Sequence, residues 1–276
     1  MLNLDQITLL CIETRSPDLA MFAINKCTRD IQFKKVVLVT DLKIPYSYPS
    51  NIELIQTPEI KTTEDYSNYL LGDLTHLIDG SHVLIIQWDS FVTNPNLWDS
   101  NFLNYDYIGA PWPHHPQTPV GNGGFSLRSI KLIKALQNNQ VLKRHPEDQA
   151  ICIDNKTLLE EKLDIKFAPL EIAEKFAFER GSHQETFGFH GMFNFAKFLS
   201  DQELSLFVQS VPKNFLGALD TYELIQDLIK RKKIHLAQQL ISKTKPKKQR
   251  KYRFHRMHFF LFMKILKLKL LGPQPR

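Results

Sequence analysis

The sequence predicts an α/β fold with a mainly parallel, doubly wound sheet flanked by helices. Short apolar runs rich in β-branched residues alternate with segments of helical periodicity over the N-terminal third, which is the pattern of βαβ units. Polar side chains stand at the ends of several of these runs, and ligands bind outside the carboxyl ends of strands in such sheets. The 276 residues, 43% of them hydrophobic, suffice for one large core or a core with an appendage.

The expected elements of this N-terminal part follow one another in regular order. Four strands are expected where the runs are compact and apolar, over residues 7–13, 34–41, 51–58 and 82–92. Two helices are expected between them, over residues 17–30 and 62–78. Ser16 is a candidate N-cap for the first helix.

The remaining elements are shorter and separated by loops. A Pro-rich loop is expected over 105–119, and a polar, aromatic loop over 179–191. Helices are expected over 127–138, with Ser129 as a cap, and over 145–163, and a short strand over 164–169. Residues 201–242 fit two or three short helices. The expected organisation is therefore a domain over 1–200, a helical extension over 201–242 and a basic tail over 243–276.

The net charge of +6 hides a strong asymmetry. All 29 acidic residues lie at or before Asp227, together with 19 Lys and Arg, so that part carries a charge of −10. The other 16 Lys and Arg follow Asp227 with no acid among them. The basic residues that give the chain a pI near 9.1 are therefore concentrated in an appendage. This pI does not indicate that the body binds nucleic acid.

The N-terminus and the cysteines favour a cytoplasmic protein. The first residues lack the basic region and small-residue cleavage site of a signal peptide. The three cysteines, Cys11, Cys27 and Cys152, lack metal-ligand spacing and are expected to be reduced and structural.

QWDSFV, residues 87–92, places Asp89 at the end of the strongest strand candidate. A buried carboxylate needs a partner, and a divalent cation bridging a diphosphate would be one. The alternative is an aspartate that caps a nearby turn or helix.

VGNGGFSLRS, residues 120–129, contains three glycines within four positions. No Gly-Lys-Ser/Thr follows, so it is not a Walker A loop, and Ser126 stands where a dinucleotide-binding loop needs its third glycine. Glycines let the backbone come close to a ligand, although a plain turn before a helix fits equally well.

Two further stretches carry titratable side chains in suggestive settings. PEDQ, residues 146–149, puts Glu147 and Asp148 in the first turn of a helix, as a general base or simply as favourable charges at a helix dipole. FGFHG, residues 187–191, sets His190 among aromatics and glycines, as a metal or phosphate ligand or as a hydrogen-bonded core residue.

The order QWDSFV, YDYIGAPW, VGNGGFSLRS, PEDQAIC, FGFHG resembles a bacterial family long classed as a domain of unknown function and related to GT-A glycosyltransferases. The resemblance covers roughly residues 50 to 195. It implies a GT-A-like, Rossmann-like fold that binds a nucleotide sugar and, through a DxD motif, Mn²⁺ or Mg²⁺. Asp89 matches the DxD region, but Phe91 stands where a second acid would be, so Asp89 and His190 are the implied metal ligands.

The resemblance also implies roles for other residues. Asp148 is the preferred catalytic base, with Glu147 as the alternative. The residues that match donor- or acceptor-binding positions are Thr14, Arg15, Asp41, Gln87, Asp89, Ser90, Gly121, Asn122, Gly123, Gly124, Phe125 and Arg128. For Arg128, contact with a phosphate and a salt bridge on a helix are both open. The xED pattern belongs to inverting members and a late histidine to retaining ones.

The tail, residues 243–271, is a basic run followed by an apolar stretch interrupted by lysines, too short to span a bilayer. On a helix, four cations fall within an arc of about 80°: Arg253, Arg256, Lys264 and Lys267. Phe260 and Leu271 intrude on that arc and Lys269 lies opposite. This pattern favours a helix in the interface of an anionic membrane. A tail helix packed on the body or a partner, and nucleic-acid binding, are the alternatives.

The sequence thus predicts a glycosyltransferase attached peripherally to the inner face of the cell membrane. It would transfer a sugar to a glycan or lipid-linked acceptor in the synthesis of a bacterial surface polysaccharide or lipopolysaccharide. A non-catalytic nucleotide- or glycan-binding module with a degenerate GT-A fold is the alternative that the incomplete DxD motif suggests.

Overall fold

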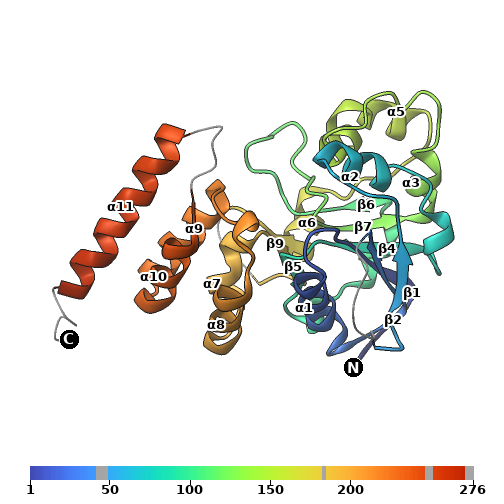
Figure 1. Cartoon of the computed structure of the whole chain (residues 1–276). Coiled ribbons are helices and arrows are strands. Elements are labelled where there is room, and N and C mark those ends of the chain that lie inside the picture. Colours follow the sequence, from blue (N-terminus) through green and yellow to red (C-terminus); the bar gives the residue numbers. More distant parts are fainter. Residues whose placement is uncertain (42–48, 182–184, 246–250, 271–276) are drawn as a thin grey trace. The chain divides into compact units, whose positions relative to one another are not determined.

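The computed structural model describes residues 1–41, 49–181, 185–245 and 251–270 (Figure 1). The chain divides into two compact units, Met1–His190 and Gly191–Arg276. Among the described residues, the strands belong to the first unit, and the elements of the second are helices. The structure is therefore of the α/β class, with a C-terminal helical region, as predicted.

Six strands form the main sheet of the first unit, in the order β3-β2-β1-β4-β7-β6. They are β1 (Leu2–Ile12), β2 (Ile31–Thr40), β3 (Glu53–Gln56), β4 (His82–Ile86), β6 (Tyr107–Ile108) and β7 (Phe125–Ser129). The first four in this order are parallel, whereas β7 runs antiparallel to β4 and to β6. The sheet is largely parallel but mixed, because β7 returns beside β4 without a parallel crossover.

The central strands are apolar along their length because both of their faces are covered. Leu9 of β1 pairs with Leu84 of β4, and both are fully buried. One face carries Leu10, Val37 and Ile85, which belong to a core cluster with α2 (Thr63–Leu70) and α3 (Ile130–Ala135). α1 (Pro17–Thr28) packs against β1 and β2.

The strand order reverses between β1 and β4. The chain proceeds from β1 outward through β2 to β3, and then returns to the other side of β1 with β4. In open α/β sheets such a switch point leaves a crevice at the carboxyl ends of the two strands, where ligands bind. This crevice lies after Ile12 and after Ile86.

The strand expected over residues 82–92 is two strands in two sheets. β4 ends at Ile86, residues 87–89 turn, and β5 (Ser90–Val92) enters a second, three-stranded sheet. There β5 pairs antiparallel with β9 (Gly188–His190), which also pairs with β8 (Ala177–Phe178). Ser90 lies opposite His190 in this ladder, so the turn that carries Asp89 is brought to the late histidine.

Four expected elements after residue 120 differ from the structure, and one of them is the loop expected over 179–191, which contains the strand β9. The helix expected from residue 127 begins at Ile130, because residues 125–129 form β7, although Ser129 does cap it by accepting from the N–H of Leu132. The helix expected over 145–163 is divided into α4 (Glu147–Gln149), a π-helical turn (Ala150–Asp154) and α5 (Lys156–Glu161). The strand expected over 164–169 provides only an isolated bridge between Phe167 and Tyr107.

The last helix of the first unit and the 3-10 turns of both units are short. α6 (Leu170–Phe176) precedes β8. Single 3-10 turns occur at Thr75–Leu77, Pro95–Leu97, Ser100–Asn104, Met192–Asn194 and Lys213–Phe215.

The second unit contains α7 (Phe195–Phe198), α8 (Asp201–Ser210), α9 (Leu219–Lys230), α10 (Ile234–Lys243) and α11 (Lys251–Leu270). The expectation of two or three helices over 201–242 is confirmed by α8, α9 and α10. Ser200 and Glu203 form a reciprocal capping box at the start of α8.

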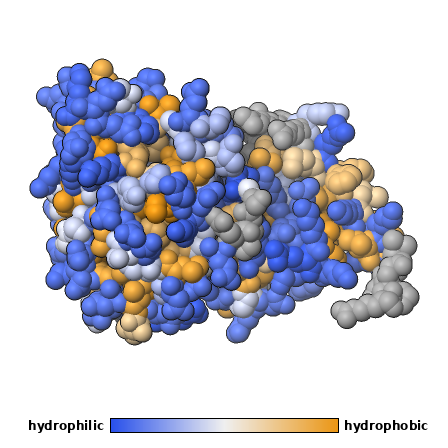
Figure 2. All heavy atoms as spheres, turned by 180° about the vertical axis from the view of Figure 1, so that it is seen from behind, coloured by the Kyte–Doolittle hydropathy of each residue, from blue (hydrophilic) through white to orange (hydrophobic). Residues whose placement is uncertain are grey.

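The tail helix α11 packs against α9 and α10 along one stripe. Phe254, Leu261 and Ile265 are buried there, and Phe254 stacks on Tyr222 with ring centroids 5.5 Å apart. The rest of α11 is largely exposed and mixes hydrophobic with hydrophilic side chains (Figure 2). The basic run at 246–250, the side chain of Arg253 and Leu271 lie outside the described residues. Within the described ranges, no helix has the length and apolar character needed to cross a membrane.

The three cysteines are buried and form no disulfide bond, as expected for structural thiols. Burial raises the pKa of Cys27 to about 12, and it also raises those of Cys11 and Cys152. Protonated, buried thiols are poor nucleophiles and poor metal ligands.

Candidate functional site

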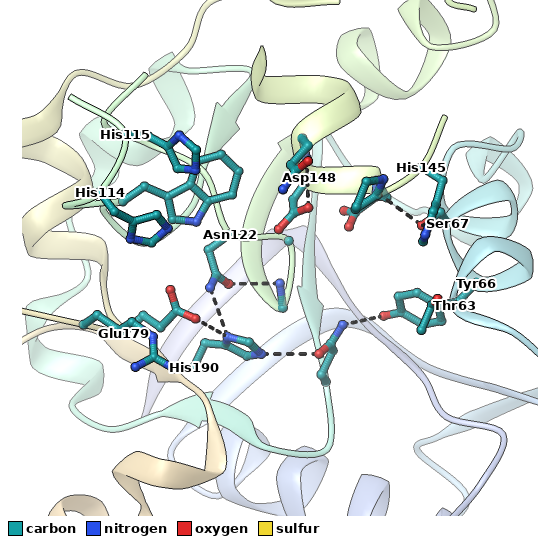
Figure 3. A pocket seen from close by; sticks show the side chains of 18 residues that line it. Thr63, Tyr66, Ser67, His114, His115, Asn122, His145, Asp148, Glu179 and His190 are labelled. Atoms are coloured by element: carbon teal, nitrogen blue, oxygen red, sulfur yellow. Dashed lines mark hydrogen bonds and ion pairs between the residues drawn. The ribbon is translucent and has the colours of Figure 1, made fainter. Parts of the chain in front are cut away.

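Two adjoining cavities lie at the switch point of the sheet. The first, of about 370 Å³, is the strand-end cavity; residues 12–15, 60–63, Tyr66, Gln87 and Trp88 line it. The second, of about 410 Å³, is the glycine-loop cavity, which the loop of residues 122–124, the start of α4 and His190 line (Figure 3). Thr63, Tyr66 and Gln87 line both. The two cavities therefore meet at α2 and at the end of β4.

A buried carboxylate shapes the strand-end cavity. Glu13 Oε1 accepts the backbone N–H of Arg15 at 2.6 Å and that of Ser16 at 3.2 Å, and Arg15 Nη2 lies 3.2 Å from Glu13 Oε2. Ser16 stands at the N-cap of α1, but its side chain makes no capping bond. Glu13 accepts from the two residues that precede α1, and so it holds Thr14 and Arg15 in the wall of the cavity.

Asp41 lies behind this wall and is not among the residues that line either cavity. Its Oδ2 accepts the backbone N–H of Ile60 at 3.2 Å. Because Ile60 lines the strand-end cavity, Asp41 supports the wall. The contact between Asp41 and a nucleoside stays a prediction.

The glycine loop gives space to three side chains of the site. A Cβ on Gly121 would collide with the ring of Trp112, one on Gly123 with the carboxylate of Glu147, and one on Gly124 with the imidazole of His190. Asn122 has a positive φ of 63°, and its Oδ1 accepts the N–H of Gly124 at 3.0 Å. The bare backbone thus lets residues from distant segments lie against the loop.

Two residues predicted to contact a ligand are buried in the core. Phe125 is 0% exposed and packs among Phe176, Phe187 and Gly188, because its position on β7 points it away from the cavity. Arg128 is also 0% exposed. The expectations of a pocket wall at Phe125 and of a phosphate contact at Arg128 are wrong.

Arg128 forms a buried ion pair with Glu147. Its Nε–H donates to Ser126 Oγ at 3.0 Å, and its guanidinium lies 5.5 Å from the centroid of the Tyr107 ring. Burial opposes the charge of Arg128, but Glu147 and Tyr107 raise its pKa above the usual range. The predicted alternative, a salt bridge of Arg128, is therefore confirmed. Arg128 lies on the strand β7, however, and not on a helix.

The two acids of PEDQ have different environments. Glu147 is buried; burial raises its pKa, Arg128 opposes this shift, and its backbone N–H donates to Ser67 Oγ at 3.2 Å. Asp148 is half-buried and lines the glycine-loop cavity. Its Oδ1 accepts the N–H of Gln149 at 2.8 Å. Asp148 is thus the acid of this pair that lies open to a bound molecule.

His190 lies between two carboxylates. Its Nε2 is 3.7 Å from Asp89 Oδ1 and 3.3 Å from Gln87 Oε1. Its Nδ1 is 3.3 Å from Glu179 Oε1 and 3.0 Å from Asn122 Nδ2. Burial opposes the charge of Glu179, but the hydrogen bond from His190 lowers its pKa. A chain of contacts thus runs from Glu179 through His190 to Gln87 and on to Tyr66; Figure 3 labels Glu179, His190 and Tyr66 along it.

The structure brings the two predicted metal ligands, Asp89 and His190, together. No group of three or more His, Cys, Asp or Glu side chains placed to hold a metal occurs among the residues that the structure describes. Metal binding stays a prediction. Ser90 is buried and donates to the carbonyl of Gly124 at 2.6 Å, so it fixes the loop and does not face the cavity.

About half of the residues that line the glycine-loop cavity were not predicted from the sequence. The missed residues are Thr63, Tyr66, Ser67, Trp112, His114, His115, His145, Glu179 and Arg180. Tyr66 and Ser67 lie on α2, whose helical periodicity alone does not reveal a polar face turned to a cavity. The pairing of Trp112 with two histidines in a Pro-rich loop was the one local signal that pointed to a site.

Gly124→Ala is expected to destabilise the protein by about 1–3 kcal/mol, the usual effect of overpacking, and to displace His190. The reason is that the new methyl group would occupy the position of the imidazole. Urea unfolding measures the free energy, and the histidine ring signals in NMR spectra report the displacement. In Gly123→Ala the added methyl meets Glu147, so the His190 signal should change less. An unchanged His190 signal in Gly124→Ala would contradict the packing described.

No protein among the curated ones compared matches the chain. A model of the family described as "Protein of unknown function (DUF5672)" matches residues 50–190, just over half of the chain. The matched segment begins before β3 and ends with His190, so it includes the glycine loop, the PEDQ acids and the turn with Asp89. The chain therefore belongs to the DUF5672 family.

Proposed function

We propose that the protein is a glycosyltransferase with a GT-A-like fold that moves a sugar from a nucleotide-sugar donor to a hydroxyl group of a glycan or lipid-linked acceptor. The observation that carries the proposal is the pair of adjoining cavities at the switch point of the sheet, with Asp148 open to the second. Ligand cavities of a few hundred Å³ with a few placed polar groups are typical of small-molecule sites.

The strand-end cavity suits the nucleoside of the donor. It lies at the carboxyl end of β1, where α/β sheets bind nucleotides. Thr14, Arg15, Lys61 and Thr62 offer polar groups at its mouth, and Trp88 and Ile60 offer apolar surface. The diphosphate would then pass Gln87 and Tyr66, which line both cavities and are joined by a hydrogen bond of 3.1 Å.

The glycine-loop cavity suits the transferred sugar and the attacking hydroxyl. Its lining is mostly polar, and the backbone of Gly123 and Gly124 is open to it. Asp148 would take the proton of the hydroxyl while it attacks the anomeric carbon. Glu147 is less suited to this role because its carboxylate is held against Arg128. Holding both reactants in this cavity would supply much of the rate by proximity and orientation.

The donor set around His190 fits a divalent cation on a diphosphate. Asp89 provides a carboxylate oxygen and His190 an imidazole nitrogen, 3.7 Å apart, and Mg²⁺ commonly takes only one or two protein carboxylates beside phosphate oxygens. Glu179 lies on the other ring nitrogen, as a carboxylate often does behind a metal-bound histidine. A cation held by Asp89 and His190 would offset the charge that builds on the departing diphosphate.

A third cavity, of about 480 Å³, offers a place for the acceptor. It is mostly apolar, with four prolines, Leu170 and Phe178 in its lining, and it shares Trp112, Glu179 and Arg180 with the glycine-loop cavity. Proline and tryptophan surfaces suit the apolar faces of sugar rings or an isoprenoid chain. An acceptor bound there would extend toward Asp148.

The test is a thermal-shift and calorimetric screen of the full chain against nucleotide sugars and nucleoside diphosphates, with Mn²⁺, with Mg²⁺ and with a chelator. The proposal expects one nucleotide to raise Tm and to bind with micromolar affinity. Hydrolysis or transfer of that donor separates an enzyme from a non-catalytic binding module. The absence of any shift across all donors and metals would remove the main support of the proposal.

Gln87→Leu is expected to weaken binding of the donor identified in this screen about tenfold, because it removes a hydrogen-bonding side chain from the junction of the cavities. Isothermal titration measures the affinity. Gln209→Leu, on the exposed face of α8, is the matched control and should leave the affinity unchanged. Equal affinities for both variants would place the donor elsewhere.

A further inference from the structure

The exposed face of α11 carries large apolar side chains that the packing of the second unit leaves uncovered. Phe254, Leu261 and Ile265 already occupy the stripe against α9 and α10. The aromatic side chains outside that stripe include Phe259, which is 66% exposed, and Phe260, which is 62% exposed. Met263, Leu266 and Leu270 are exposed as well.

These apolar residues and the cations of α11 occupy adjoining sectors. At about 100° per residue, one sector of about 100° holds only His255 and large aromatic or apolar side chains: Tyr252, Phe259, Phe262, Met263, Leu266 and Leu270. The neighbouring sector of about 80° holds Arg256, Lys264 and Lys267, all exposed, with Phe260 among them. Lys269 lies on the far side of the apolar sector, next to the packed stripe. The apolar sector is therefore flanked by cations on both sides.

The charge of this face is not balanced by acids of the tail. The sequence contains no Asp or Glu after Asp227. An apolar sector between cations matches the interface of an anionic bilayer, where aromatic and aliphatic side chains enter the acyl boundary and cations meet the headgroups. A second copy of the same face would bring like charges together.

We propose that α11 binds the surface of an anionic lipid bilayer through this exposed face while its other face remains packed on α9 and α10. The helix lies in the plane of the interface and does not cross the membrane. The proposal is independent of glycosyl transfer, because it uses no residue of the cavities.

The test measures binding of the full-length protein to phosphatidylcholine vesicles with and without phosphatidylglycerol. Binding is expected to require phosphatidylglycerol and to weaken as salt is raised. Lys264→Glu/Lys267→Glu is expected to reduce the partition coefficient by at least about tenfold. Phe259→Ser/Phe262→Ser is expected to reduce it by at least about tenfold as well, through lost apolar burial.

Matched controls lie on exposed positions outside α11. Lys162→Glu/Lys166→Glu changes the net charge equally, and Leu142→Ser/Leu206→Ser removes two exposed apolar side chains. Both controls should bind like the unmodified protein. Circular dichroism and Tm verify that every variant is folded.

Three outcomes would overturn the proposal. One is equal binding to neutral and anionic vesicles or no binding to either. Another is a light-scattering mass that shows a dimer lost in the Phe259→Ser/Phe262→Ser variant, without vesicle binding. The third is tight RNA binding that both α11 variants lose, again without vesicle binding, which would assign the face to nucleic acid.

Discussion

Asp148→Asn is expected to lower the rate of glycosyl transfer by about 10²–10⁴-fold, the usual contribution of a positioned general base. The substitution keeps the shape and the acceptor Oδ1 that Gln149 N–H uses, but it removes the group that takes the proton. Donor affinity should change by less than about twofold, because Asp148 would act on the acceptor. Single-turnover transfer assays and isothermal titration of the donor measure the two quantities separately.

Two comparison variants isolate this effect. Glu161→Gln, on an exposed position at the end of α5, removes a charge from a nearby segment and should leave transfer unchanged. Glu147→Gln disturbs the ion pair with Arg128. Its main effect should therefore be a lower free energy of unfolding and not a lower rate of transfer. Transfer by Asp148→Asn at the unmodified rate would exclude Asp148 as the base. If Asp148→Asn lost donor binding as well as transfer, Asp148 would be needed to form the donor site and not only to take the proton of the acceptor.

The sequence was sufficient for the parallel part of the sheet, because burial imposes long apolar runs on strands such as β1, β2 and β4, but β6 falls in the loop expected over 105–119. It was not sufficient for β7. FSLRS contains two apolar and three polar residues, and helical spacing continues into α3, so local periodicity did not separate strand from helix. The strand forms because Phe125 and Leu127 pair with Ile86 and Leu84 of β4. That long-range pairing overrides local preference.

The candidate site was predictable where short motifs carry it. Gly123, Gly124, Asp148 and His190 line one cavity, as their order along the chain suggested, and Asp89 contacts His190 without lining that cavity. The motif GNGG did not reveal what its glycines contact, since Trp112, Glu147 and His190 come from other segments. Nor did the pattern of FSLRS show that Arg128 points into the core, because an arginine is rarely buried unless it is paired.

Arg128→Met is expected to destabilise the protein by about 3–5 kcal/mol, because it leaves the carboxylate of Glu147 buried without its partner. Urea unfolding measures the loss. Arg29→Met removes an arginine from the exposed pair with Asp30 and should cost less than about 1 kcal/mol. Equal losses for the two variants would contradict a buried ion pair at Arg128.

The double variant Arg128→Met/Glu147→Gln tests the cause of that loss. If the cost arises from an uncompensated charge, neutralising Glu147 should recover a large part of it, and the double-mutant cycle should give a coupling of about 0.5–3 kcal/mol. If the cost arises from the lost contact of the Arg128 guanidinium with the Tyr107 ring, the two losses should add. The first result would also explain why the two acids of PEDQ, Glu147 and Asp148, have different roles. Glu147 would be committed to Arg128 in the core, so Asp148 would be the acid of this pair left to meet a bound molecule.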